Sequence, residues 1–355
     1  MVQHKIAVAS SDRPTMRDVA ALAGVGIKTV SRVVNDEPNV SSETKQRVHR
    51  AITQLNYQPD INAGNLKRSD GRTGAIGLLV GNVANPFSGA IHRAVETEAR
   101  RRGVAVFAAS LDEDPLKEAE TVRGFLRRRV DGLILTTATA NQRYLLPEIQ
   151  RGVPIVFIDR EARGISVDAV VTENRAGAAT GARHLLARGH RRIAYLGDDL
   201  MLQTAGERLA GFRDALAEAG STAEIPPLNG PMSVASAETA IGTLLDAPEP
   251  PTAILTGQNL ATIGAVRALH ARGLEHRIAL VGFDDFSLAD LLSPGVTVVA
   301  QDPSSIGARA AQRLFARLDG DTGAPQTVRL PTTLIERGSG EISPGPQPPR
   351  KGITP

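Results

Sequence analysis

The sequence predicts an all-α headpiece with a helix-turn-helix, followed by an α/β core of two doubly wound parallel-sheet subdomains. Residues 15–35, TMRDVAALAGVGIKTVSRVVN, have the pattern of two short helices joined by a tight turn. From Gly74 onward, short runs rich in Val, Ile and Leu alternate with amphipathic stretches of helical period. A chain of 355 residues is also too long for one hydrophobic core, so several domains are expected.

The headpiece is predicted to span residues 15–58 and to contain three helices. Thr15 can cap the first helix, and Asp18, three residues later, completes a pattern like a capping box. Gly24 supplies a turn that a Cβ atom would obstruct. The apolar positions of the second and third helices are expected to form the core of this domain: Val30, Val33, Val34, Val48, Ala51, Ile52 and Leu55. The exposed face of the second helix could then enter the major groove of DNA.

Positive charge is concentrated in the same part of the chain. Residues 1–72 contain eleven Lys or Arg and seven Asp or Glu, a net charge of +4, whereas the whole chain carries +3. A solvated charged face would spread such an excess evenly, whereas a phosphate-binding module needs it locally. The charge distribution therefore favours double-stranded DNA as a partner.

The composition excludes several other classes of protein. The chain contains no Cys, which rules out disulfides and thiolate metal sites and fits a reducing compartment. It has no run of about 18 apolar residues. Residues 1–14, expected to be a disordered leader, lack a secretory hydrophobic region. We therefore expect a cytoplasmic protein that has no membrane partner.

The motifs of common enzymes are missing from the sequence. Its seven His residues show no paired metal-ligand spacing, and there is no P-loop, nucleophile elbow or GxGxxG after a strand. His184 and His190 flank a predicted helix end and are expected to be structural. A dehydrogenase or kinase would be supported by fold alone. We therefore expect no catalytic residue, no metal and no cofactor.

The core is predicted from the alternation of apolar strands and helices. Strands are expected at residues 75–81, 104–110, 132–137, 154–159, 193–198, 253–257 and 278–284. Helices are expected at residues 89–102, 115–129, 176–188, 206–219 and 260–272. Continuous apolar strands with helical crossovers indicate parallel sheets that are covered on both faces. Ligands of such sheets bind beyond the carboxyl ends of the strands.

Several motifs occur in order along the chain: DVAALAGV and TVSRVVN, VSSETKQRVHRAITQLNYQP, IGLLVGNVANPF, RRRVDGLIL, PIVFIDR, HLLARGHRRIAYLG, RLAGF, VGFDD and LIERGS. Their order and spacing, from about Thr15 to Arg337, resemble the LacI/GalR family of bacterial transcription regulators. A helix-turn-helix alone would be weak evidence, because many folds carry one. The resemblance implies a regulator, more commonly a repressor, that binds a pseudo-palindromic operator as a homodimer and responds to a small effector.

The resemblance also implies a core like that of periplasmic sugar-binding proteins, preceded by a hinge helix. Residues 59–73 form the linker in which that hinge helix is expected. The N-subdomain would comprise residues 74–171 and 303–327, and the C-subdomain residues 172–299 and 328–338. Residues 339–355, rich in Pro and Gly, are expected to be a disordered tail. This tail lacks leucine heptads, which favours a dimer over a coiled-coil tetramer.

By position in the family motif, Ile27, Lys28 and Arg32 look like base readers. Lys or Arg can donate to guanine O6 and N7, and Ile can pack on a thymine methyl group. The alternative is that both cations contact only phosphate. The residues expected to contact phosphate, which sets register rather than sequence, are Thr15, Thr29, Ser31 and Asn35. Thr15 could also serve only as a helix cap.

Two parts of the headpiece and linker depart from the family pattern. Gly26 stands where the recognition helix usually begins with Ser; Gly is a slightly poorer N-cap and has no hydroxyl. In the hinge, where Ala-Arg is common, the chain has Ala63, Gly64, Asn65 and Leu66. Ala63 and Leu66 are expected at the minor groove, with Leu66 as a wedge, and Gly64 should give a hinge helix that folds only on the operator. Leu66 could otherwise be a surface leucine of the linker.

Six residues fall at family positions that line the effector cleft: Asp159, Arg208, Gln258, Asn259, Asp284 and Gln301. Phe87 is added to this set as a side chain that could contact the effector. Carboxylates accept from adjacent hydroxyls, and arginine donates a fork to ring or anionic oxygens, which suits a polyol. Asp159 and Asp284 each follow an apolar strand and should lie at its carboxyl end; each could instead be a helix cap or a satisfied buried carboxylate. Many relatives have Asp in place of Asn259, and Phe87 could stack on a sugar or belong to the core.

The effector implied by this resemblance is small and hydroxylated, a monosaccharide or its phosphate. It would close the cleft and shift the N-subdomains across the dimer interface, and a coupling of about 1–3 kcal/mol would change operator affinity roughly 5- to 150-fold. The sequence does not give the sign of this change. The alternatives are a regulator of the same fold controlled by a phosphocarrier protein and, with less support, a sugar-binding protein or an enzyme.

Overall fold

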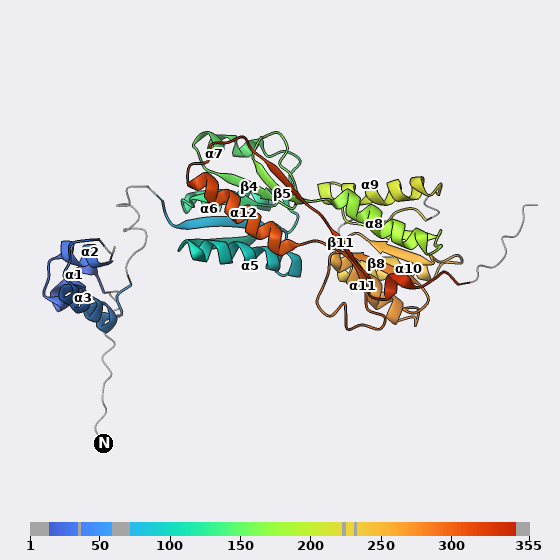
Figure 1. The fold of residues 1–355 in the computed structure, drawn as a ribbon, viewed down its shortest axis with the longest axis horizontal. Helices are drawn as coiled ribbons and strands as arrows, with labels where there is room; N and C mark the ends of the chain where they lie inside the picture. Colours follow the sequence, from blue (N-terminus) through green and yellow to red (C-terminus); the bar gives the residue numbers. More distant parts are fainter. Residues whose placement is uncertain (1–13, 35–36, 59–71, 222–224, 231–232, 346–355) are drawn as a thin grey trace, which may run out of the picture. The chain divides into compact units, whose positions relative to one another are not determined.

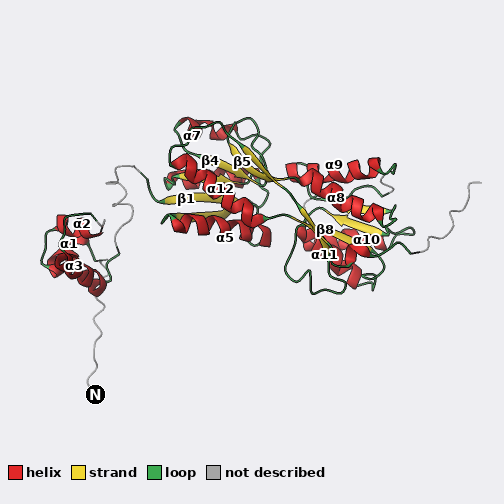
Figure 2. Cartoon of the chain, viewed as in Figure 1, coloured by secondary structure: helices red, strands yellow, loops and turns green. Residues whose placement is uncertain are grey.

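The computed structural model describes residues 14–34, 37–58, 72–221, 225–230 and 233–345. These residues form two compact units, divided between Thr73 and Gly74 (Figures 1 and 2). The first unit is all helical and the second contains two sheets with helices around them, so the predicted fold class is confirmed. Among the described helices, none is both long and apolar enough to cross a membrane. Residues 1–13 of the expected leader and residues 59–71 of the expected hinge, including Ala63 and Leu66, lie outside the described residues, as does Asn35.

The headpiece helices are α1 (Met16–Ala23), α2 (Ile27–Val34) and α3 (Ser42–Leu55). The capping box at the start of α1 is confirmed, because Asp18 N donates to Thr15 Oγ1 at 3.4 Å and Thr15 N donates to Asp18 Oδ2 at 2.7 Å. Gly24 ends α1 in the left-handed region with φ of 63°, where a Cβ atom would be strained, so its predicted role in the turn is confirmed.

The three helices enclose one small apolar cluster. Its buried members are Val19, Ala20, Ala23, Val30, Val33, Val48, Ala51 and Tyr57. The prediction that Val34, Ile52 and Leu55 are buried is wrong, because these side chains pack against the cluster and remain partly exposed at its rim. A core of this size has few fully enclosed positions, so its outer apolar residues keep contact with solvent.

The N-subdomain is built on a sheet of six strands among the described residues. In the order of the sheet they are β10 (Thr327–Leu330), β5 (Asp168–Thr172), β4 (Ile155–Ile158), β3 (Gly132–Leu135), β1 (Ala75–Val80) and β2 (Ala105–Ser110). All neighbouring strands are parallel. Helices α5 (Pro86–Arg101) and α12 (Pro303–Leu318) cover one face, and α6 (Pro115–Arg127) and α7 (Leu146–Gln150) cover the other (Figure 1).

The C-subdomain is built on five strands among the described residues. In the order of the sheet they are β11 (Thr333–Ile335), β9 (Thr297–Ala300), β8 (Ala279–Phe283), β7 (Ala253–Thr256) and β6 (Ile193–Leu196). Only β11 runs antiparallel to its neighbour. Helices α8 (Asn174–Ala187) and α9 (Gln203–Glu218) cover one face, and α10 (Val234–Leu245) and α11 (Asn259–His270) cover the other. Both subdomains are therefore doubly wound.

The chain crosses between the subdomains at three short connections within the described residues. The connections join β5 to α8, β9 to α12 and β10 to β11. The expected limit near residue 171 lies one residue from the end of β5 at Thr172, whereas the expected limit near residue 327 falls too early, because β10 runs to Leu330 and pairs with β5. Strand β5 was not among the expected strands, because it begins with a carboxylate that is buried in the fold. Asp168 is compensated by Arg313 and Arg317 of α12, far away in the sequence.

The expected disordered tail begins too early. Residues 339–341 form a short 3₁₀ helix, η2 (Ser339–Glu341), and Ser339 is buried. Ser339 Oγ donates to Leu280 O at 2.6 Å, and the ring of the buried His190 lies 2.7 Å from Ile342 O. These contacts hold the segment on the C-subdomain up to residue 345, because leaving their buried polar groups unpaired would be costly. Residues 346–355 lie outside the described part of the chain.

Candidate functional site

Helix α2 presents the three predicted base readers on its solvent side. Ile27 is 45% exposed, so its side chain is accessible to a partner. Lys28 and Arg32 are both exposed and four residues apart, so they lie on the same face. Arg32 Nε lies 3.8 Å from Glu37 Oε2, with both side chains at least half exposed, so this pair is screened and leaves the guanidinium accessible. This face combines an apolar contact with two mobile donors.

The predicted phosphate contacts lie around the same helix. Thr29 and Ser31 are half-buried on α2, and Thr15 is exposed at the start of α1. The hydroxyl of Thr15 also donates to Asp18 Oδ2 at 2.7 Å, so its capping role is established, and these hydrogen bonds lower the pKa of Asp18. Gly26 directly precedes α2, and its carbonyl accepts from Val30 N at 3.2 Å. A Cβ atom there would meet nothing within 4 Å.

A cleft of about 980 Å³ lies between the two subdomains of the core. All seven residues predicted to line it do so: Phe87, Asp159, Arg208, Gln258, Asn259, Asp284 and Gln301. Asp159 follows β4 and Asp284 follows β8, as their position after apolar strands predicted. Phe87 lines the cleft and also packs against the core of the N-subdomain, so its two predicted roles are compatible.

Arg208 of α9 is the central cation on the C-subdomain side. Its Nε donates to Asn174 Oδ1 at 2.8 Å and its Nη1 donates to Gly257 O at 2.7 Å. The guanidinium lies over the Phe283 ring at 4.0 Å from the centroid, a favourable cation–π position. These contacts fix a buried donor at the carboxyl end of the second sheet.

Asp284 lies beside Arg208, with its Oδ2 3.7 Å from Arg208 Nη1. Its Oδ1 accepts from Gln301 Nε2 at 2.6 Å, and Gln301 belongs to the connection between β9 and α12. Burial raises the pKa of Asp284, although Arg208 and the Gln301 hydrogen bond oppose that rise. Gln301 Oε1 is buried and has no hydrogen-bond partner among the described residues, so it remains available to a ligand hydroxyl.

Asp159 is the equivalent carboxylate on the N-subdomain side. Both aspartates have left-handed backbone conformations, with φ of 66° at Asp159 and 68° at Asp284. Such strain in a non-glycine residue is found where surrounding structure fixes a side chain for a purpose. Burial raises the pKa of Asp159, and the neighbouring Arg160 and then Arg208 counteract this. Two largely enclosed carboxylates from different subdomains therefore face one cleft.

Two amide residues of the C-subdomain complete the predicted set. Gln258 Nε2 donates to Asp198 Oδ2 at 2.6 Å. Asn259, at the start of α11, exchanges two hydrogen bonds with Asn85, at 2.8 and 3.2 Å. Asn85 caps α5 of the N-subdomain through Phe87 N at 3.0 Å, so the amide pair spans the cleft. Asn at position 259, where many relatives have Asp, permits this reciprocal pairing, because each amide side chain both donates and accepts a hydrogen bond and neither is charged.

Sequence reasoning did not identify Arg160 and Glu113, which also line the cleft. Arg160 follows Asp159 directly in the run PIVFIDR, and that adjacency was the only available signal for it. Glu113 lies in the turn between β2 and α6, where no local pattern marks it. The two residues are 47 positions apart and meet only in the folded protein.

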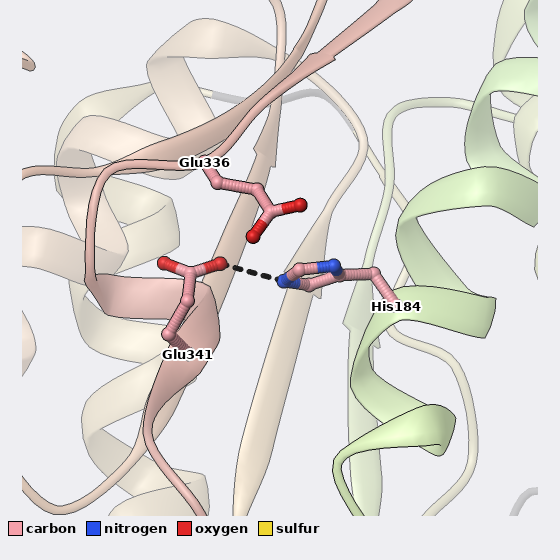
Figure 3. A group of neighbouring side chains, drawn as sticks. All are labelled: His184, Glu336 and Glu341. Atoms are coloured by element: carbon pink, nitrogen blue, oxygen red, sulfur yellow. Dashed lines mark hydrogen bonds and ion pairs between the residues drawn. The ribbon is translucent and has the colours of Figure 1, made fainter.

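His184, Glu336 and Glu341 form a second cluster of polar side chains outside the cleft (Figure 3). Figure 3 shows the His184 ring of α8 pointing at Glu341 of η2, and the two lie 2.7 Å apart. Arg188 contacts both carboxylates, at 3.2 Å from Glu336 and 3.6 Å from Glu341. The Arg188 guanidinium already supplies the positive charge that a metal ion would bring. We therefore interpret this cluster as a set of contacts that holds η2 against α8.

The chain matches two known families over most of the described residues. Residues 15–60 match the bacterial regulatory proteins of the lacI family, and residues 182–340 match the periplasmic binding protein-like domain. The lac repressor dimer bound to operator and the anti-inducer ONPF has a TM-score of 0.81 and 29% identity, covering 93% of this chain and 99% of that chain.

Relatives of known name match over nearly their whole length. The HTH-type transcriptional regulator DegA of Bacillus subtilis is 33% identical over 336 residues, which cover 92% of this chain and 98% of DegA. The ribose operon repressor of Escherichia coli is 32% identical over 332 residues, covering 92% of this chain and 99% of that protein. These relatives are transcriptional regulators and not enzymes. The chain therefore belongs to the LacI family of bacterial HTH-type transcriptional regulators.

Proposed function

We propose that this regulator is a repressor that binds a pseudo-palindromic operator as a homodimer, and that a small sugar-like effector in the cleft changes its operator affinity. The observation that carries the effector proposal is the pair of carboxylates of Asp159 and Asp284, whose side chains are 13% and 8% exposed and each lie beside an arginine. Carboxylates and guanidinium groups in a water-poor cleft bind adjacent hydroxyls from both sides. The names of the ribose operon repressor and the operator-bound lac repressor support the same reading.

The DNA contacts in this proposal begin with α2. Ile27, Lys28 and Arg32 would read bases, because they form the exposed face of that helix. Thr15, Thr29 and Ser31 would position phosphates. The roles of Asn35, Ala63 and Leu66 rest on their family positions alone, since these residues lie outside the described part of the chain. We place this activity in the cytoplasm, where a bacterial chromosome lies.

The homodimer is supported by apolar surface on the core. Strand β2 is an edge strand of the first sheet and is largely exposed, with Phe107 at 42%. Leu116, at the start of α6, is 81% exposed, and in the C-subdomain Leu288 and Leu291 are 65% and 74% exposed. Exposed edge strands and apolar patches are aggregation hazards unless a partner covers them. A second copy of this chain would cover them, and two headpieces would then reach two operator half-sites.

The proposed switch is cleft closure. The three short connections between the subdomains allow a small hinge motion, and Gln301 lies on one of them. A ligand that contacts Asp159 and Asp284 together would favour the closed arrangement, because it would bridge the two subdomains. A coupling of about 1–3 kcal/mol to the headpieces would change operator affinity roughly 5- to 150-fold.

The experiment uses the full-length protein. Duplexes would be selected from random DNA by their affinity for the protein, and operator affinity would then be measured by fluorescence anisotropy with each of a panel of monosaccharides. The proposal predicts a palindromic selected sequence and a sugar that changes operator affinity. It also predicts that Asp284→Asn keeps operator binding and loses the sugar response. Selection of no sequence, or a response only to a phosphocarrier protein, would contradict the proposal.

A further inference from the structure

Arg160 is the cation on the N-subdomain side of the cleft. Its side chain is 7% exposed, and its Nη1 donates to the Thr137 carbonyl oxygen at 2.7 Å. Its Nε lies 3.5 Å from Asp159 Oδ2 and has no hydrogen-bond partner among the described residues. A buried guanidinium in a ligand cleft is the usual means of binding a phosphate or carboxylate, because its planar fork matches two anionic oxygens.

That fork is already occupied by Glu113. Arg160 Nη1 donates to Glu113 Oε2 at 2.6 Å, and Nη2 donates to Oε1 at 2.9 Å. Glu113 follows Asp112 in a turn where both residues are in the left-handed region, with φ of 53° and 56°, and its side chain is 39% exposed. Its Oε1 also lies close to Gly81, where an added Cβ atom would approach it to 3.3 Å. The protein thus supplies the anion that a charged ligand would otherwise supply.

The guanidinium of the second arginine of the cleft, Arg208, is also engaged by other groups of the protein. Arg208 donates to Asn174 and Gly257, and it lies beside Asp284. Among the residues that line the cleft, these two arginines are the cations and six residues are carboxylates: Asp112, Glu113, Asp159, Asp198, Asp199 and Asp284. The formal charge of the lining is therefore 2 − 6 = −4.

We infer that the cleft selects an uncharged polyhydroxylated ligand over its phosphorylated or carboxylated counterpart, and that Glu113 sets this selectivity by occupying Arg160. The inference rests on the proposed effector function and narrows its ligand class. The hydroxyl groups of a neutral sugar can donate to cleft oxygens such as Gln301 Oε1 and accept from N–H groups such as Arg160 Nε. An anion would have to displace Glu113 from Arg160 and would then lie in a cleft whose lining carries more carboxylates than cations, and such like-charge contacts favour the neutral ligand.

The test compares matched ligands on the full-length protein by calorimetry and thermal shift. The probes are neutral pentoses and hexoses, and for each the sugar phosphate and the aldonate. The expected result is that the neutral parent binds more tightly than either anion by a factor of about 30 or more. An anion that binds as tightly as its parent would overturn the inference and leave the proposed effector site intact. If no sugar of either charge binds, the proposed effector function itself fails.

Glu113→Gln isolates the role of the carboxylate, because the amide keeps its shape and frees a net positive charge on Arg160. This variant should narrow the neutral-to-anion affinity ratio by about tenfold or more. Asp112→Asn removes the adjacent carboxylate, which contacts Asn82 and Lys117 and not Arg160, and should change the ratio much less. Glu120→Gln makes the same charge change on the exposed side of α6, outside the cleft lining. Equal effects from all three variants would overturn the assignment to Glu113, and the wild-type ratio tests the selectivity even if Glu113→Gln folds poorly.

Discussion

Arg208→Met should destabilise the core by about 3 kcal/mol at pH 8 and by less at pH 5. The substitution removes hydrogen bonds from a charged donor to Asn174, at 2.8 Å, and to the Gly257 carbonyl, at 2.7 Å. Each such bond contributes about 1.5–3 kcal/mol. Part of the loss is offset, because Met still packs on Phe283 and no cation is buried, which leaves a net cost of about 2–4 kcal/mol.

The pH dependence comes from Asp284, whose side chain is 8% exposed and lies 3.7 Å from Arg208. Burial raises the pKa of Asp284 above its ordinary value of 3.8, and Arg208 is the first of the groups that oppose this rise. A carboxyl with a raised pKa in the folded state loses stability as the pH rises from the ordinary value through the folded value. Without Arg208 the folded pKa rises further, so the cost of the substitution grows with pH.

Urea unfolding of the ligand-free protein at pH 5, 6.5 and 8 measures this effect, with the melting temperature as a second readout. A loss of 1 kcal/mol corresponds to roughly 2–4 °C in a domain of 150–250 residues, and to a smaller shift in a larger domain. Arg183→Met is the matched control, because Arg183 pairs with Glu218 at the surface and is 51% exposed, so its loss should cost under about 1 kcal/mol. A destabilisation by Arg208→Met that is independent of pH, or no larger than that of the control, would refute the reasoning.

Three further predictions concern the DNA-binding face, the amide pair across the cleft and the dimer. Lys28→Ala should weaken operator binding. If Lys28 contacts phosphate, the slope of log affinity against log salt concentration falls by about one, whereas if it contacts a base, about 1–3 kcal/mol of discrimination is lost at one base pair. Anisotropy on operator variants at several salt concentrations separates the two roles, and unchanged affinity would exclude both. Asn259→Ala removes both hydrogen bonds to Asn85 and should weaken sugar binding by about three- to tenfold. Calorimetry that shows wild-type sugar affinity would exclude a role for this pair in closure. Phe107→Lys places a charge on the exposed edge strand and should shift sedimentation toward the monomer, and a dimer of wild-type stability would place the interface elsewhere.

The cleft residues could be predicted where the signal was local. Asp159 and Asp284 follow long apolar runs directly, and the carboxyl ends of parallel strands meet at one edge of each sheet. Thr15, Asp18 and Gly24 were predictable for the same reason, since capping and turn chemistry act over a few residues. In each case one short stretch of sequence contains the whole physical cause.

Features that depend on distant residues could not be predicted. Glu113 and Arg160 meet across 47 positions, and Asn85 and Asn259 across 174, so neither pair leaves a pattern in its own segment. Strand β5 begins at the buried Asp168, a residue type that favours turns in a sequence-based prediction. It can lie in a buried strand because Arg313 and Arg317 of α12 pair with its carboxylate, and that pairing cannot be seen in the local sequence. The segment after residue 338 looked like a tail because its Pro and Gly content was visible and its contacts with the C-subdomain were not.

The central claim is that operator binding and ligand binding in this chain are two sides of one equilibrium. The most direct test measures the operator dissociation constant with and without a saturating neutral sugar, and the sugar dissociation constant with and without saturating operator. Linkage requires the two ratios to be equal, and the account predicts a common factor of roughly 5 to 150. A sugar that binds tightly in the cleft while the operator dissociation constant stays unchanged would contradict the account.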